Sequence, residues 1–148
     1  MYRHIEQTWQ KVTKDAYGDI RARAIQWRKQ RVVVRLDKPS KLQRARAFGY
    51  KAKKGIAVVR IKVGRGGMRR PRPVSGRRPK HLGVTRMRAN VSMQQVAERR
   101  VGEKYPNMKV LGSYFVHKDG KHLWYEVILA DPINPSIASD ENFRNAFA

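Results

Sequence analysis

The sequence of 148 residues contains no cysteine, and it has only 11 acidic residues against 34 lysines and arginines. The absence of cysteine excludes disulfides, thiolate metal sites and thiol nucleophiles. No apolar run approaches the roughly 18 residues that a membrane-spanning helix needs. The chain begins Met1-Tyr2-Arg3, without the apolar stretch of a secretory signal, so we expect a cytoplasmic protein.

Carboxylates are scarcest where positive charge is densest. Residues 21–100 hold 26 lysines and arginines but only Asp37 and Glu98, a surplus of +24, whereas the rest of the chain sums to −1. Because paired acid–base catalysis depends on such carboxylates, we expect no enzyme. Charge confined to one stretch indicates a surface that binds a polyanion, with nucleic acid and anionic membrane as the candidates.

Sites for metals, cofactors and membranes are also poorly supported. His117 and His122 flank a predicted turn, but two imidazoles make an incomplete metal site, and we expect no cofactor. The run Gly64-x-Gly66-Gly67 lacks the spacing and the Lys-Ser/Thr ending of a phosphate-binding loop. A membrane-surface role would require a basic amphipathic helix with a broad apolar face, which the sequence does not show.

Apolar periodicity predicts helices in the first third of the chain. Trp9 and Trp27 lie on stripes of helical spacing in two segments that are separated by a break near Gly18. We expect both tryptophans to pack on a core rather than to stack on bases. A third, short helix is predicted to begin after Pro39 and to end at Gly49.

The remaining patterns indicate strands and one more helix. The β-branched run 32–34 and the alternating run 56–63 predict strands, the second with Arg60 and Lys62 on one basic face. Ser92 and Gln95 fit a capping box that starts a helix.

Asp119-Gly120 is a favoured two-residue turn between two apolar runs and predicts a β-hairpin. In the expected register Val110 faces Leu129. By the same register, Tyr114 faces Tyr125 and Ser113 lies opposite Glu126. Glu98, on the preceding predicted helix, is expected to be a helix-surface partner for a neighbouring arginine.

Together these elements predict an α+β fold: a small, mostly antiparallel sheet packed with helices, plus N-terminal helices and long basic extensions that penetrate RNA. We expect a single domain over residues 1–148. Its expected parts are a mostly helical region (1–36), a basic helix-turn-strand (37–63), an extended basic Arg/Gly/Pro-rich segment (64–90), a helix plus β-hairpin (91–137) and a C-terminal end (138–148).

The first candidate binding segment joins a basic helix end to a basic turn that is flanked by Gly49 and Gly55. Glycine lets backbone approach phosphate closely, and lysines supply point charges around an aromatic ring. The alternative is a solvated loop whose tyrosine covers the core. The residues expected to contact RNA here are Arg44, Arg46, Tyr50, Lys51, Lys53 and Lys54.

The second candidate segment, residues 64–88, has too little apolar content to form a core of its own. Arginine favours bidentate phosphate contacts and stacking on bases, and proline favours extended backbone. The alternative is a disordered linker. The residues expected to contact RNA here are Arg65, Arg69, Arg70, Arg72, Arg77, Arg78, Lys80, Arg86 and Arg88.

Several of these segments resemble a known family. The runs that carry the resemblance are Arg46-Ala-Phe-Gly-Tyr-Lys-Ala-Lys-Lys-Gly55, Arg65-Gly-Gly-Met-Arg-Arg-Pro71 and Tyr125-Glu-Val-Ile-Leu-Ala-Asp-Pro132. In order and spacing they resemble the ribosomal protein L-fifteen-e family of archaea and eukaryotes. The resemblance implies a structural constituent of the large ribosomal subunit that binds and stabilises ribosomal RNA tertiary structure through Arg/Lys-rich extensions. It implies partners in large-subunit ribosomal RNA and neighbouring ribosomal proteins, with no membrane and no small-molecule substrate.

The chain departs from the family pattern in two places. Gly112 stands where the family usually has asparagine. The family usually continues past this chain's last residues with a basic Gly- and Arg-rich tail, so the resemblance implies that the C-terminal end (138–148) is either truncated or that of a short member. Two other function classes stay open from the residues alone. A DNA-binding or chromatin-type protein would prefer a compact basic recognition helix, and an RNA-modifying enzyme needs a cofactor pocket or catalytic pair.

Overall fold

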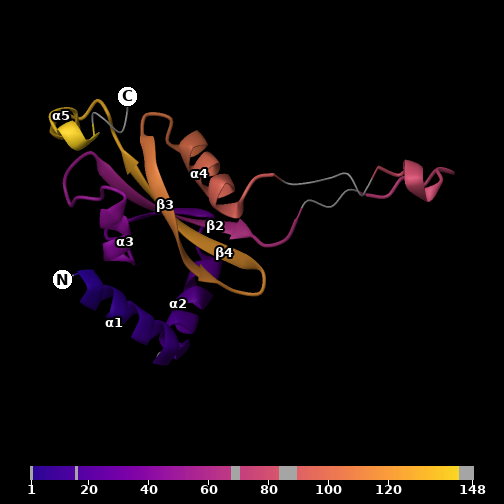
Figure 1. Ribbon diagram of the computed structural model, residues 1–148, viewed down its shortest axis with the longest axis horizontal. Coiled ribbons are helices and arrows are strands. Elements are labelled where there is room, and N and C mark those ends of the chain that lie inside the picture. The colour runs from indigo at the N-terminus through magenta and orange to yellow at the C-terminus, as the bar shows by residue number, and fades with distance from the viewer. Residues whose placement is uncertain (1, 16, 68–70, 84–89, 144–148) are drawn as a thin grey trace.

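The computed structural model describes residues 2–15, 17–67, 71–83 and 90–143. Its elements are α1 (Tyr2–Asp15), α2 (Tyr17–Lys29), β1 (Val33–Leu36), α3 (Leu42–Ala47), β2 (Ile56–Gly64), the 3₁₀ turn η1 (Pro79–His81), α4 (Met93–Lys104), β3 (Lys109–Lys118), β4 (His122–Ala130) and α5 (Pro135–Ala138). The strands form one antiparallel sheet in the order β1-β2-β4-β3, with helices around it (Figure 1). The predicted α+β class is confirmed.

One face of the sheet packs on α4. Ala97 and Val101 of α4 are fully buried against alternate residues of the two central strands, among them Val59, Ile61 and Val127. These strand residues follow the period of two that places every second side chain on the same face. This apolar layer is the main core of the protein.

The helix boundaries follow local signals closely. The Ser92 side chain accepts a hydrogen bond from the Gln95 amide, and the Gln95 side chain accepts one from the Ser92 amide, so the predicted capping box is confirmed. The helix ends at Lys104, before Pro106. α1 ends at Asp15 and α2 begins at Tyr17, close to the break predicted near Gly18, and Gly18 itself is inside α2. A single glycine costs a helix only about 1 kcal/mol, which other interactions can offset.

The opposite face of the sheet is covered by α2 and α3. Ala45 of α3 is fully buried beside Trp124 and Ile128 of β4. The half-buried Trp27 of α2 packs on the same cluster, with its ring centroid 6.0 Å from that of Trp124. Trp27 therefore packs on the core, as the helical spacing predicts.

On the predicted basic face of β2, Arg60 is buried and Lys62 is half-buried. Arg60 is only 7% exposed, its guanidinium lies 4.4 Å from the centroid of the Trp27 ring, and it donates to the Gln30 side chain. The ammonium of Lys62 donates to the carbonyls of Arg28, at 2.9 Å, and of Gln30. The last carbonyls of a helix lack intrahelical donors and carry partial negative charge. Both cations thus bind the end of α2. The alternation of basic and apolar residues along the strand could not reveal this contact.

The hairpin register agrees with the prediction only at its open end. Val110 pairs with Leu129 as expected, but a register shift just after Val110 places Tyr114 opposite Glu126 rather than Tyr125. Because side chains alternate across a strand, a shift of one residue moves them to the other face of the sheet. A β-bulge of this kind leaves no clear signature in an apolar run.

The shift also changes the partners of two polar residues. Ser113 pairs with Val127, so the expectation that it lies opposite Glu126 is wrong. The Ser113 hydroxyl instead donates to the carboxylate of Glu98 on α4. Glu98 therefore binds the sheet, where the sequence predicted an arginine partner on the helix surface.

The turn of the hairpin is formed by Gly120 and Lys121, one position later than predicted. The Asp119 amide donates to the His122 carbonyl at 2.9 Å, and the Asp119 carboxylate accepts from the amides of Lys121 and His122. Gly120 does not have the positive φ that the expected turn requires. The aspartate side chain sets this turn by bonding backbone two and three residues ahead.

Candidate nucleic-acid interface

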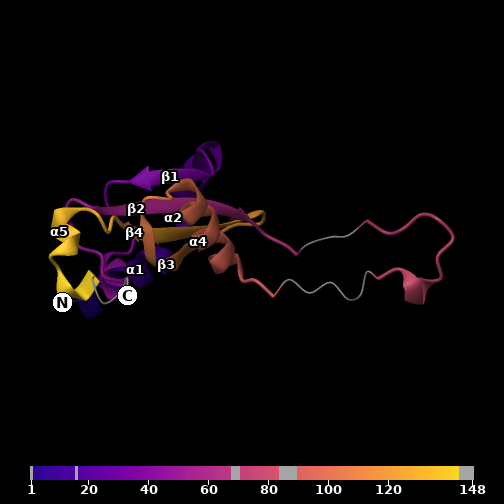
Figure 2. The same cartoon turned by 90° about the horizontal axis from the view of Figure 1, so that it is seen from above.

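The basic arm, defined here as the described residues 65–67 and 71–83, carries positive charge without a role in the core. Residues 71–83 lie apart from the sheet in both views of the molecule (Figures 1 and 2). None of the apolar clusters formed by described residues includes a residue of the arm, and Val74 is 98% exposed. The cations of this segment are all exposed, and no ion pair joins them to another described residue; they are Arg72, Arg77, Arg78 and Lys80.

The base of the arm is held by the hairpin turn. The Arg65 amide donates to the Lys121 carbonyl at 2.9 Å, and the Arg65 guanidinium donates to the Asp119 carbonyl at 2.7 Å. These bonds fix where the arm leaves the sheet. The other arginines expected to bind RNA in this segment lie outside the described residues; they are Arg69, Arg70, Arg86 and Arg88.

The lysines of the turn after α3 divide into two kinds. Lys51 and Lys53 both bind the Asp140 carboxylate, at 2.8 and 2.9 Å, and Lys53 also donates to the Ser136 carbonyl. These lysines hold the pKa of Asp140 well below its usual range. Lys54 is exposed, and no ion pair joins it to another described residue. The positive charge of this turn is therefore partly neutralised within the chain.

Gly55 is required by packing on the segment that follows β4. Its φ is +88°, and a Cβ at this position would lie 2.7 Å from Cγ1 of Ile137. The Gly55 carbonyl accepts from the Asp131 amide at 2.8 Å. This contact with protein explains the glycine without a close approach to phosphate, which was the predicted reason.

The remaining predicted residues lie on and after α3. Arg44 is exposed, and the Arg46 guanidinium donates to the Tyr2 hydroxyl at 2.9 Å. Tyr50 is half-buried and packs against the cluster that contains Ala45, which is the arrangement of the alternative interpretation, a tyrosine that covers the core. Its ring still lines two surface grooves, so part of it faces outward.

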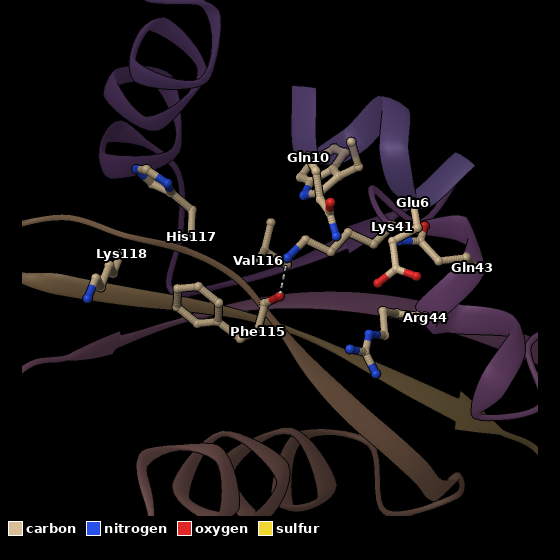
Figure 3. Close-up of a pocket in the computed structure, with 10 residues that line it drawn as sticks. Glu6, Gln10, Lys41, Gln43, Arg44, Phe115, Val116, His117 and Lys118 are labelled. Atoms are coloured by element: carbon tan, nitrogen blue, oxygen red, sulfur yellow. Dashed lines mark hydrogen bonds between the residues drawn. The ribbon is translucent and has the colours of Figure 1, made fainter. Parts of the chain in front are cut away.

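A pocket of about 460 Å³ lies between α1, α3 and β3 (Figure 3). Lys41 fills part of it, since its ammonium donates to the Phe115 carbonyl at 2.8 Å and lies 5.4 Å from the centroid of the Trp9 ring. Burial lowers the pKa of Lys41, and the nearby charge of Glu126 opposes this shift. Glu6, Arg44 and Lys118 also line the pocket, so its cations lie beside a carboxylate.

Glu126 holds the beginning of α3 against the sheet. It is fully buried and accepts hydrogen bonds from the Ser40 amide, at 2.9 Å, from the Ser40 hydroxyl and from the Tyr114 hydroxyl, at 2.6 Å. Burial, and then the charge of Glu126, raises the pKa of Tyr114. Arg60 pairs with Glu126 across the strands. Sequence reasoning missed this cluster, although a lone carboxylate within an apolar strand was a signal for it.

The two histidines near the hairpin turn both contact Trp124 rather than each other. Their ring centroids lie 5.7 Å (His117) and 5.8 Å (His122) from that of Trp124. Within the described ranges, no group of three or more potential metal-ligating side chains occurs. The helices that the structure describes include none of the length and apolarity that crossing a membrane requires.

Comparison with known proteins agrees with the resemblance seen in the sequence. The sequence profile of the family described as Ribosomal L15 matches residues 1–146. The Large ribosomal subunit protein eL15 of Methanocella arvoryzae is 49% identical over 142 residues, which is 95% of this chain and 72% of that protein. The chain therefore belongs to the Ribosomal L15 family, which is the L-fifteen-e family that its sequence motifs resemble. The members of this family are structural ribosomal proteins and not enzymes.

Proposed function

We propose that this protein is a structural component of the large ribosomal subunit that binds ribosomal RNA through its basic arm and through the turn around Lys54. Family membership and the name of the archaeal relative support the location in the ribosome. The observation that carries the RNA-binding part is the arm itself, because its cations beyond Arg65 are exposed and no ion pair joins them to another described residue.

The composition of the arm region favours phosphate as its counter-charge. Residues 64–90 contain nine lysines and arginines and no aspartate or glutamate. Cations at this density repel one another until anions neutralise them, and each phosphate contact releases counterions from RNA. Contacts of this type position a protein without reading sequence, so specificity depends on the shape of the RNA.

The folded part of the chain supplies a fixed starting point for these contacts. The sheet and its helices hold both ends of the arm region, at Gly64 on β2 and ahead of Met93 on α4. We propose that residues 1–148 act as one unit, with ribosomal RNA around the arm and neighbouring ribosomal proteins against the remaining surface. In this scheme Lys51 and Lys53 stabilise the protein itself, and Lys54 binds RNA.

A comparison of nucleic acids tests the proposal. The purified chain is titrated with a transcript of large-subunit ribosomal RNA and with duplex DNA of equal length at about 150 mM salt. At this ionic strength long-range attraction between exposed charges is largely screened. The affinity should therefore depend mainly on how well the protein surface fits the folded RNA. We expect the RNA to bind more tightly, and the RNA affinity to fall steeply as salt rises further. Equal or tighter binding to duplex DNA would contradict the proposal.

A further inference from the structure

A groove of about 660 Å³ lies between the beginning of α1, α3 and the turn after α3. We propose that this groove binds one unstacked nucleobase of RNA, with the ring of Tyr2 as the stacking surface. This inference rests on the proposed RNA-binding function and adds to it a site that distinguishes unpaired from paired nucleotides.

Tyr2 is exposed and yet held in place. Its side chain is 50% exposed, its hydroxyl accepts a hydrogen bond from Arg46 at 2.9 Å, and the guanidinium carbon of Arg46 lies 5.4 Å from the ring centroid. An exposed aromatic ring with a fixed orientation loses little conformational entropy when a base stacks on it. Because Arg46 lies over one face of the ring, the base stacks on the other face.

The lining of the groove suits a nucleotide. Bases of single-stranded RNA bind aromatic and apolar surfaces, while their phosphates bind lysine and arginine. The second aromatic ring of the groove is that of Tyr50, and none of the described lining residues carries a carboxylate. The apolar lining residues are Pro39, Leu42 and Ala52, and the cationic ones are Lys38, Arg46 and Lys51.

The charges decide between RNA and a protein partner as the occupant. Lys51 already pairs with Asp140, but no ion pair joins Lys38 or Arg46 to another described residue. An apolar side chain from a neighbouring protein would fill the groove, but it would bring no counter-charge to these two cations. A nucleotide fills the same apolar space and brings its phosphate with it. The pocket in Figure 3 differs from this groove, because the carboxylate of Glu6 lines it beside its cations and the Lys41 ammonium donates to the Phe115 carbonyl.

Two RNA hairpins of equal length test the inference, one fully paired and one with a single unpaired nucleotide in its stem. Stacking of one base on an aromatic ring contributes roughly 1–3 kcal/mol, so we expect the wild-type protein to bind the bulged RNA about 5- to 150-fold more tightly. Tyr2→Ala should abolish this preference without changing the slope of affinity against salt, because no phosphate contact is lost. Tyr2→Phe keeps the ring and should retain the preference.

Phe115→Ala is the matched control, since it removes another exposed ring, 40% exposed, outside the groove. It should leave the preference for the bulged RNA intact. If the wild-type protein binds both RNAs equally but with a steep salt dependence, the groove proposal fails and RNA binding stands. If Phe115→Ala abolishes the preference and Tyr2→Ala does not, the base binds elsewhere. If neither RNA binds, the proposed function itself fails. Melting temperatures of all variants establish that each is folded.

Discussion

Gly112 is the residue at which this chain departs from its family pattern, and the structure gives a physical reason. A Cβ at Gly112 would lie 2.5 Å from Cδ1 of Phe48. Nonbonded carbon atoms essentially never come this close, so the Phe48 ring or the backbone would have to shift. Phe48 in turn stacks on Tyr114, with ring centroids 6.5 Å apart. The glycine therefore makes room for an aromatic pair between α3 and β3.

Replacing Gly112 with asparagine should destabilise the protein by about 1–3 kcal/mol, the usual cost of overpacking. Urea denaturation measures this, and Phe48→Ala in the same chain should remove most of the penalty, because the clash disappears. Gly102→Ala is the control, since no neighbouring atom lies within 4 Å of its Cβ position and it is in a helix. The control should be neutral or stabilising by up to about 1 kcal/mol. A cost at Gly112 that persists without the Phe48 ring would contradict this explanation.

Single residues also show which parts of the candidate site the sequence could predict. Arg72 and Arg77 are exposed, as the low apolar content of their segment predicts. Lys51 and Lys53 resemble Lys54 in the sequence, but Asp140 binds only the first two in the described structure. That distinction depends on a residue more than 80 positions away. No local pattern contains it.

Among the elements, the hairpin shows a pH dependence that follows from Asp119. Burial raises the pKa of its carboxyl, but hydrogen bonds from the amides of His122 and Lys121, together with Arg28, outweigh this and lower the pKa from 3.8 to about 2. Between these two values the folded state binds fewer protons than the unfolded state. The contribution of Asp119 to stability is therefore complete above about pH 4 and is lost as the pH falls toward 2.

We expect Asp119→Asn to lower the melting temperature at pH 7, because the amide is uncharged and accepts these hydrogen bonds less strongly. As the pH falls to 2, the melting temperatures of variant and wild type should converge. Thermal denaturation followed by circular dichroism at the two pH values measures this. A difference of the same size at both values would show that the charge of Asp119 does not stabilise the turn.

Elements whose signals are local could be predicted, and those that depend on distant partners could not. The capping box at Ser92 involves four consecutive residues and was predicted correctly. The register of the hairpin depends on β-bulges, and these follow from how both faces of the sheet are covered. The alternation places Arg60 and Lys62 on one face of a strand, but the sequence does not show that the end of α2 packs over that face.

The whole molecule combines a folded sheet with an arm that contributes no residue to the apolar clusters of the described structure. The sheet packs apolar residues on both of its faces. The arm has the opposite character, with exposed cations and little apolar surface. The protein has a formal net charge of +23. Binding an anion lowers its electrostatic free energy most where the cationic side chains are close together and have few ion pairs with acidic residues.

The salt dependence of RNA binding by two matched variants tests this account most directly. The arm variant replaces Arg72, Arg77 and Arg78 with glutamine. The α4 variant replaces the exposed Arg99, Arg100 and Lys104 with glutamine. Each variant therefore lowers the net charge of +23 by three. Each phosphate contact contributes about 0.7–0.9 to the slope of log affinity against log salt. We expect the arm variant to reduce the slope by about 2–3 at an unchanged melting temperature, and the α4 variant to leave the slope nearly unaltered. Equal reductions in the two variants, or a slope that the arm variant does not change, would contradict the claim that RNA phosphates neutralise the arm.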